Sequence, residues 1–181
     1  AWRTIRVVPE NVPVPVEELP QGQTPIVPTA RESTPDLTVT ISDRPDGRWL
    51  EWNFYSPHQC KMPRKQVRIR FRETRAEAFA EENIKSISTC RGTDLLDNQI
   101  KNASQEISKY MPRAFWSVLK QVCEKVKERN PQQIPTVLII SSDPYIPWEL
   151  AFTGPKYIIQ SLINPSCPPF LGAQLKVGRW I

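Results

Sequence analysis

The sequence predicts an α+β fold that leads into an α/β sheet. Stretches that alternate with period two lie in the first half of the chain, and stretches with helical periodicity fill its middle. An unbroken apolar run, Val137 to Ile140, follows the helical part. Such a run is typical of a strand that is covered on both faces of a parallel sheet. We therefore expect a small antiparallel β region, a helical segment and then the first strands of a parallel sheet.

Residues 1–35 are expected to form a Pro-rich arm or a linker. Prolines recur too closely for a helix or a central strand to persist. They are Pro9, Pro13, Pro15, Pro20, Pro25, Pro28 and Pro35. Residues 2–8 alternate and could form an edge strand, paired with a neighbouring molecule or with the sheet that follows. The chain begins with Ala1 rather than Met, which fits a processed product, a renumbered chain or a piece of a longer protein.

Residues 36–73 are predicted to contain a β-hairpin and a third strand. Residues 37–42 alternate with period two, and residues 48–55 are rich in aromatic side chains. Asp46-Gly47 supplies the turn between them. Residues 66–72 alternate again, with apolar side chains on one face and arginines on the other.

Residues 74–134 are predicted to be helical. Three apolar stripes have helical spacing, and Arg91-Gly92 separates the first from the second. The stripes are Ala76, Ala80, Ile84 and Ile87; Leu96, Ile100, Ala103, Ile107 and Tyr110; and Phe115, Leu119, Val122 and Val126. The third helix is expected to start at Pro112 and to stop at Asn130-Pro131. Each stripe predicts a helix that packs on one side.

Residues 135–181 are predicted to start an α/β domain. After the apolar strand, residues 141–144 break the chain at the strand's carboxyl end, where open α/β sheets usually bind ligands. Asp143 is the carboxylate best placed for function there, although Asp before Pro is also a common turn or helix-cap residue. Further short strands are expected at residues 156–160 and 174–177.

Pro147 can occupy the first turn of a helix, because its missing N–H is not needed there. That helix would contain Trp148, Glu149 and Leu150. We expect the Trp148 indole to fill the space between the helix and the sheet, and the Glu149 carboxylate to bind free N–H groups at the helix start. This segment is therefore interpreted as mainly structural.

Ile-Pro-Trp-Glu-Leu after an apolar strand and an acidic turn, followed by Phe170-Leu-Gly and Val177-Gly-Arg-Trp180, resembles the opening of a CHAT domain, a caspase-like cysteine peptidase module of bacteria. The likeness covers residues 135–181. It implies the first strands of a caspase-like parallel sheet, whose first loop, with Asp143, lines the substrate cleft. It also implies peptide-bond cleavage by a His and a Cys on later strands.

Neither the His-Gly motif nor the Cys motif of that family is present in the sequence. We therefore expect the amino-terminal part of such a peptidase, inactive alone. The catalytic His and Cys would come from a missing carboxyl-terminal part, on the same chain or on a partner chain. The resemblance further implies a protein substrate, an activating protein partner and a role in bacterial defence or regulated proteolysis.

His58 and Cys60 are the residue types of a thiol nucleophile and its base. Residues two apart at a loop edge seldom hold the geometry, and His58 is the only histidine, so no catalytic residue is assigned. The four cysteines, Cys60, Cys90, Cys123 and Cys167, contain no C-x-x-C pair. Reduced structural thiols are therefore expected, with no metal and no cofactor.

A basic run follows the aromatic strand. It comprises Arg64, Lys65, Arg68, Arg70 and Arg72. The run could bind a nucleic-acid backbone, could form a protein-partner surface, or could be the solvated face of an edge strand. The excess of 24 basic over 19 acidic residues is mild, which makes nucleic acid the weakest of these readings.

An alternative of a different class is a non-catalytic interaction module, in which a Pro-rich arm and a helical face bind partners and the peptidase-like end is degenerate. No run approaches the roughly 18 apolar residues of a membrane helix, and the N-terminus lacks the regions of a signal peptide. A cytoplasmic location without membrane contact is therefore the expectation.

Overall fold

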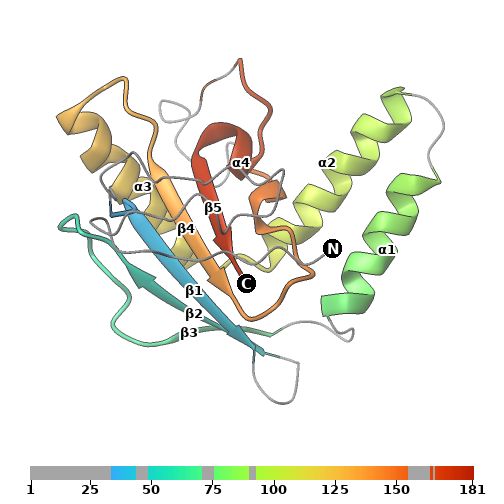
Figure 1. Ribbon diagram of the computed structural model, residues 1–181, viewed down its shortest axis with the longest axis horizontal. Coiled ribbons are helices and arrows are strands. Elements are labelled where there is room, and N and C mark those ends of the chain that lie inside the picture. The colour runs from blue at the N-terminus through green and yellow to red at the C-terminus, as the bar shows by residue number, and fades with distance from the viewer. Residues whose placement is uncertain (1–33, 44–48, 71–75, 90–92, 155–163, 165) are drawn as a thin grey trace, which may run out of the picture. The chain divides into compact units, whose positions relative to one another are not determined.

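The chain's structure, a computed structural model, describes residues 34–43, 49–70, 76–89, 93–154, 164 and 166–181 (Figure 1). These residues belong to the unit Thr34–Ile181. Their elements, in chain order, are β1 (Leu37–Asp43), β2 (Trp49–Tyr55), β3 (Val67–Arg70), α1 (Ala76–Ser88), α2 (Thr93–Lys109), α3 (Arg113–Arg129), β4 (Thr136–Ser141), the 3₁₀ helix η2 (Trp148–Leu150), α4 (Leu171–Gln174) and β5 (Lys176–Trp180). The predicted arm, apart from residues 34 and 35, and the strand expected at 156–160 lie outside the described residues.

The strands of this unit form one mixed sheet in the order β3-β2-β1-β4-β5. β1 and β2 make the antiparallel hairpin that their alternating residues predict, with Val39 opposite Phe54. β3 adds antiparallel to β2, with Leu50 opposite Ile69, so the third predicted strand is also confirmed. A mixed sheet with helices is an α+β architecture, in agreement with the predicted class.

β4 lies between β1 and β5 and runs parallel to both, which confirms the prediction of an interior, parallel strand. Val39 pairs with Ile139 on one side, and Val137 pairs with Val177 on the other. The pairing of β1 with β4 joins residues about 100 positions apart into one sheet. It also brings the carboxyl ends of β1, β4 and β5 to the same edge.

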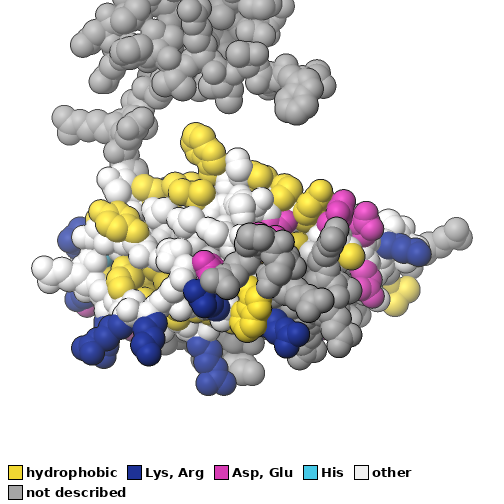
Figure 2. Space-filling model, turned by 90° about the horizontal axis from the view of Figure 1, so that it is seen from below, with side chains coloured by type: hydrophobic (Ala, Val, Ile, Leu, Met, Phe, Trp, Pro, Cys, Tyr) yellow, Lys and Arg dark blue, Asp and Glu magenta, His cyan; other side chains and the backbone are white. Residues whose placement is uncertain are grey.

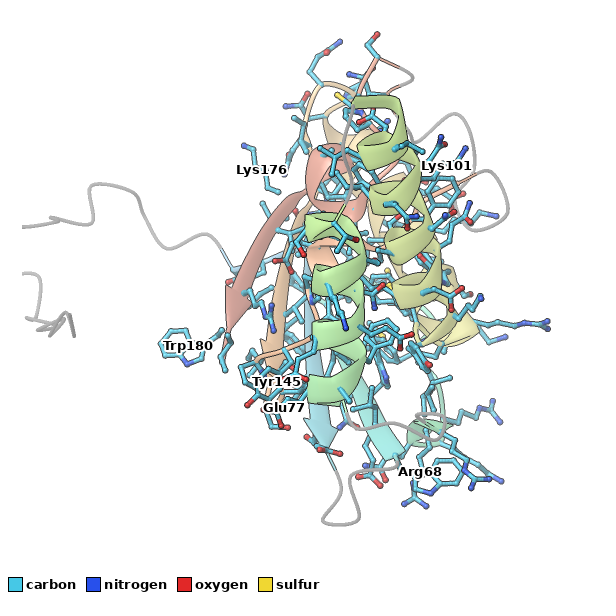
Figure 3. The ribbon with its side chains drawn as sticks, turned by 90° about the vertical axis from the view of Figure 1, so that its right-hand side faces the viewer. Arg68, Glu77, Lys101, Tyr145, Lys176 and Trp180 are labelled. Atoms are coloured by element: carbon cyan, nitrogen blue, oxygen red, sulfur yellow. The ribbon has the colours of Figure 1, made fainter. Side chains whose placement is uncertain are left out.

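The helices that the structure describes cover one face of the sheet. Figure 3 shows α1 and α2 on one side of the strands. On that face Val137 and Ile139 are 2% and 0% exposed, whereas Leu138 and Ile140 on the opposite face are only partly buried. The expectation that the apolar run is covered on both faces is therefore not met by the described helices. Burial along β4 alternates as it does in a sheet covered on one face.

The three predicted helices are confirmed as α1, α2 and α3. α3 begins at Arg113, because Pro112 holds an extended backbone with φ −67° and ψ 150° and acts as the N-cap. It ends at Arg129, before Asn130. Its predicted stripe is buried throughout, so α3 supplies much of the core beneath the sheet.

Two predictions near the C-terminus are wrong in detail. Residues 171–174 form the short helix α4, and the last strand starts at Lys176 rather than Gln174. The Gln174 amide donates to three backbone carbonyl oxygens of residues 164–168, so it ties down the preceding loop instead of joining the sheet. The helix expected at Pro147 is a single 3₁₀ turn, η2, with Pro147 as its N-cap.

An aromatic cluster joins η2 to the sheet and to α3. The Trp148 ring lies edge-on to the Trp52 ring, with 5.1 Å between the ring centroids, and the centroids of the Trp52 and Phe115 rings are 6.0 Å apart. Trp148 and Phe115 are 0% exposed and Trp52 is 1% exposed. The Trp148 side chain thus turns inward, as predicted, and seals η2 against the sheet.

Trp148→Ala is expected to lower the free energy of unfolding by about 3–5 kcal/mol, because it leaves a cavity that the surrounding rings cannot fill. Trp180→Ala is the matched control, since this indole is 70% exposed, and it should change stability by about 0.5 kcal/mol or less. Urea unfolding followed by circular dichroism measures both. Equal midpoints for Trp148→Ala and the unchanged protein would contradict the packing role.

Candidate functional site

Asp143 lies in the turn at the carboxyl end of β4 and is 5% exposed. Its backbone N–H donates to Ser141 Oγ at 3.2 Å, and its Oδ1 accepts the Tyr145 N–H at 2.8 Å. An Asp that accepts the N–H two residues ahead closes an Asx turn. The carboxylate therefore has the turn role foreseen from the sequence, and only one of its oxygens is used for it.

Arg179, on β5, brings this turn together with η2. Its Nη2 donates to the backbone oxygen of Asp143 at 3.0 Å, and its Nη1 lies 3.8 Å from Glu149 Oε2. We call Asp143, Glu149 and Arg179 the carboxyl-edge cluster. Its members come from three different elements, and none of them was linked to another by sequence reasoning.

The signal for Arg179 is its position in β5. It is two residues from Val177, so both side chains point to the same face of the strand, and both are partly buried. An arginine at an inward position of a strand needs a partner, because an unpaired buried charge is costly. The residue type, together with the alternation along β5, could therefore have identified Arg179 as a candidate site residue.

Each member of the carboxyl-edge cluster has a buried polar atom that no described residue satisfies by a hydrogen bond. These atoms are Asp143 Oδ2, Glu149 Oε2 and Arg179 Nε. Leaving such a group unpaired costs roughly 1–3 kcal/mol, and more where it is charged. Asp143 Oδ2 and Glu149 Oε2 can accept hydrogen bonds and Arg179 Nε can donate one, so the cluster fits a ligand that offers both donors and an acceptor, such as a peptide main chain.

The pKa of Asp143 is raised above its ordinary value because burial disfavours the charged carboxylate. The N–H groups of Tyr145 and Ile146 and the positive charge of Arg179 act in the opposite direction and do not cancel the effect of burial. A buried carboxylate with a raised pKa at a strand end is a frequent property of functional sites.

Two exposed aromatic rings lie at the same end of the sheet as the cluster. Tyr145 is 48% exposed and Trp180 is 70% exposed. Figure 3 shows both at the end of the sheet where β4 and β5 finish. Figure 2 views the molecule from that end, where hydrophobic, acidic and basic side chains all reach the surface and Lys and Arg gather along one border.

The expected role of Glu149 is wrong. Its carboxylate makes no hydrogen bond to a backbone N–H that the structure describes, and it faces Arg179 instead. Pro147 and Trp148 keep their structural roles at the start of η2, and Leu150 is 38% exposed. Within the Pro-Trp-Glu-Leu segment, the glutamate is therefore the residue whose position suggests more than packing.

His58 pairs with Asp36. Its Nε2 lies 2.8 Å from Asp36 Oδ1, and both side chains are nearly buried. The pKa of the Cys60 thiol is raised because burial disfavours the thiolate, which outweighs the hydrogen bond with Ser56 and the charge of Lys125. A reactive cysteine needs a lowered pKa, so this pair lacks the electrostatics of a catalytic dyad.

Asp36 is the centre of a polar network that joins distant parts of the chain. Its Oδ2 accepts both the N–H and the hydroxyl of Thr136, each at 2.8 Å, and its backbone oxygen accepts the Ser56 hydroxyl at 2.6 Å. The network therefore joins the starts of β1 and β4 to the loop after β2. Sequence reasoning missed it, because the partners of Asp36 are 20 to 100 residues away.

The described members of the basic run, Arg64, Lys65, Arg68 and Arg70, are exposed, and Arg72 lies outside the described residues. Arg68 Nε pairs with Glu51 Oε1 at 3.0 Å across the β2–β3 ladder.

No helix of the described part is long and apolar enough to cross a membrane.

Asp143→Asn is expected to raise Tm at pH 7, because it removes a buried charge while an amide oxygen still accepts the Tyr145 N–H. The folded pKa of Asp143 is raised, so its ionised form costs stability above that pKa and the cost disappears as pH falls toward 3.8. The difference between the variant and the unchanged protein should therefore shrink in melts at acid pH. A variant less stable than the unchanged protein at pH 7 would contradict this account.

Asp36→Asn should have the opposite effect and lower stability at pH 7 by about 1–3 kcal/mol, because an amide cannot accept both Thr136 donors as well as the His58 bond. Burial raises the pKa of Asp36, but the bonds from Thr136 and His58 outweigh it, so the folded pKa lies below 3.8.

The stabilisation by Asp36 should therefore be complete above pH 3.8 and be lost as pH falls through the lower folded value. Exposed Asp97 is the control, and Asp97→Asn should leave both stability and its pH profile unchanged. Urea midpoints between pH 2 and pH 7 measure the two profiles.

Comparison of the chain with protein-family models, with curated proteins and with solved structures found no significant match. The case for a family relationship therefore rests on the residues of the Pro-Trp-Glu-Leu segment and on the geometry of the sheet edge.

Proposed function

We propose that residues 135–181 begin a CHAT-type, caspase-like cysteine peptidase domain, and that β1 to β3 complete its sheet on one side. The catalytic His and Cys would be supplied by polypeptide outside the 181 residues, on the same chain or on a partner chain. In this proposal the carboxyl-edge cluster forms one wall of the cleft that receives a peptide substrate. Regulated proteolysis in a bacterial cytoplasm, with an activating protein partner, is the setting that the resemblance suggests.

The observation that carries the proposal is the half-satisfied Asp143 carboxylate at the carboxyl end of an interior parallel strand. Its Oδ2 is buried without a hydrogen-bond partner among the described residues, and burial raises its pKa. A residue that served only the turn would need one accepting oxygen, which Oδ1 provides. The second oxygen is available to a ligand at the edge where open parallel sheets usually bind ligands.

The position of the Trp-Glu-Leu segment supports the same reading. Trp148 anchors η2 against the sheet, and this places Glu149 3.8 Å from Arg179. A packed anchor followed by a polar residue at the sheet edge is an efficient way to fix a polar group in a cleft.

A second candidate is a non-catalytic interaction module. A cavity lined by part of the basic surface favours it, and that cavity is independent of the carboxyl-edge cluster. The two candidates differ in one decisive respect, since only the peptidase requires a thiol from elsewhere.

The proposal is tested on the native protein, tagged at its own gene and purified with everything that accompanies it. We expect peptidase activity that iodoacetamide abolishes, whereas the 181-residue chain alone should be inactive. Asp143→Asn should fold and lower kcat/KM at least tenfold, and Arg70→Gln, an exposed matched control, should leave kcat/KM unchanged.

If the native protein had no thiol-dependent activity, the peptidase proposal would be overturned and the interaction module would remain. Activity in the isolated chain that His58→Ala or Cys60→Ala removes would also overturn it. An active native protein in which Asp143→Asn has full kcat/KM would reject the cleft role of the carboxyl-edge cluster alone.

A further inference from the structure

The ladder between β2 and β3 opens before β2 ends. Pairing stops at Trp52 opposite Val67, although β2 continues to Tyr55 and stays paired with β1 on its other side. Pro63 has no N–H to give to a ladder, and the chain bends at Arg64 and Lys65. Residues 62–66 therefore diverge from β2, and no strand of the described part pairs with one edge of residues 53–55.

A cavity of about 180 Å³ occupies this split. It is lined by Trp52, Asn53, Phe54, Met62, Pro63, Arg64, Lys65 and Gln66. A cavity of roughly 150 Å³ lined by apolar side chains accepts a benzene molecule. The split is therefore large enough for one aromatic or large aliphatic side chain.

The two sides of the cavity differ in chemistry. Trp52, Phe54 and Met62 contribute apolar groups that are continuous with the core, and they lie beside the polar residues Asn53 and Gln66. Arg64 and Lys65 are exposed at the rim, and neither forms an ion pair with a described carboxylate. The nearby Glu51 is already engaged, because it accepts from Gln66 Nε2 at 2.7 Å and pairs with Arg68. The rim thus has two uncompensated positive charges near these apolar groups.

We propose that this cavity, the β2–β3 pocket, binds a short acidic segment of a partner protein. One aromatic or large aliphatic side chain of that segment enters the pocket, and flanking Asp or Glu residues pair with Arg64 and Lys65. The main chain of the segment lies along the open edge of β2 at residues 53–55, where it adds backbone hydrogen bonds. This inference does not depend on the peptidase proposal.

A peptide fits these observations better than a nucleic acid. Stacking of bases requires open aromatic faces, but Trp52 is 1% exposed and its faces are engaged by Phe54, Phe115 and Trp148. An open strand edge, in contrast, presents backbone groups in the spacing of another peptide.

The test uses a phage library of random 12-residue peptides, panned on the full 181-residue chain. A pocket variant, Arg64→Glu with Lys65→Glu, reverses the rim charge. The control, Lys101→Glu with Lys176→Glu, makes the same change of net charge at exposed sites that Figure 3 places far from Arg68 on β3. A third variant, Met62→Trp, enlarges a side chain that lines the pocket without changing charge. Far-UV circular dichroism and thermal melts check that each variant folds.

We expect enriched peptides with an aromatic or large aliphatic residue flanked by acidic ones. Synthetic copies measured by fluorescence polarisation should bind the pocket variant and Met62→Trp at least tenfold more weakly, and the control within twofold of the unchanged chain. Replacing the apolar residue of the peptide by Ala should weaken binding to a similar extent.

Four outcomes would overturn the inference. Enriched peptides could lack the acidic and apolar residues, or no clone could prefer the unchanged chain over Met62→Trp. The control could also weaken binding as much as the pocket variant, which would indicate a general charge effect. Finally, labelled oligothymidylate could bind the unchanged chain and lose affinity to the same extent in the pocket variant and in Met62→Trp. That result would assign the pocket to single-stranded nucleic acid.

Discussion

The parallel pairing of β1 with β4 is the constraint on which the rest of the structure depends. It joins residues about 100 positions apart, and closing so long a loop has an entropic cost that must be recovered by contacts. The apolar residues of both strands recover part of it on the covered face, where Val39 and Ile139 are fully buried. The Asp36–Thr136 bonds fix the register at one end, since a slip by one residue would turn the apolar residues of β4 outward.

The same parallel arrangement brings the polar side chains together at the other end of β4. Because β5 also runs parallel to β4, Arg179 and the Asp143 turn meet at one edge. The two acidic residues near the ends of β4 then have opposite environments. Asp36 has every oxygen engaged and its pKa is lowered, whereas Asp143 has one buried oxygen free and its pKa is raised. Asp36 therefore stabilises the fold, and Asp143 costs stability in a way that a ligand could relieve.

Local patterns predicted the elements well but not their contacts. The stripes of α3 and the alternation of β1 and β2 specify which face is buried, because side-chain periodicity is a property of neighbouring residues. The position of Arg179 beside Asp143 and of His58 beside Asp36 depends on strand order, which periodicity does not contain. The single turn at η2 and the late start of β5 were missed for a related reason, since loop contacts such as those of Gln174 decide them.

The two candidate surfaces share the sheet but are separated within it. The β2–β3 pocket and the carboxyl-edge cluster have β1 between them, and strands lie about 4.8 Å apart. One chain of contacts connects them, from Trp52 in the pocket wall to Trp148 in η2 and on to the neighbouring Glu149. Coupling along such a chain requires an element with two arrangements, and Trp148, fully buried in an edge-on contact, favours one. Occupation of the β2–β3 pocket should therefore leave the geometry of the carboxyl-edge cluster unchanged.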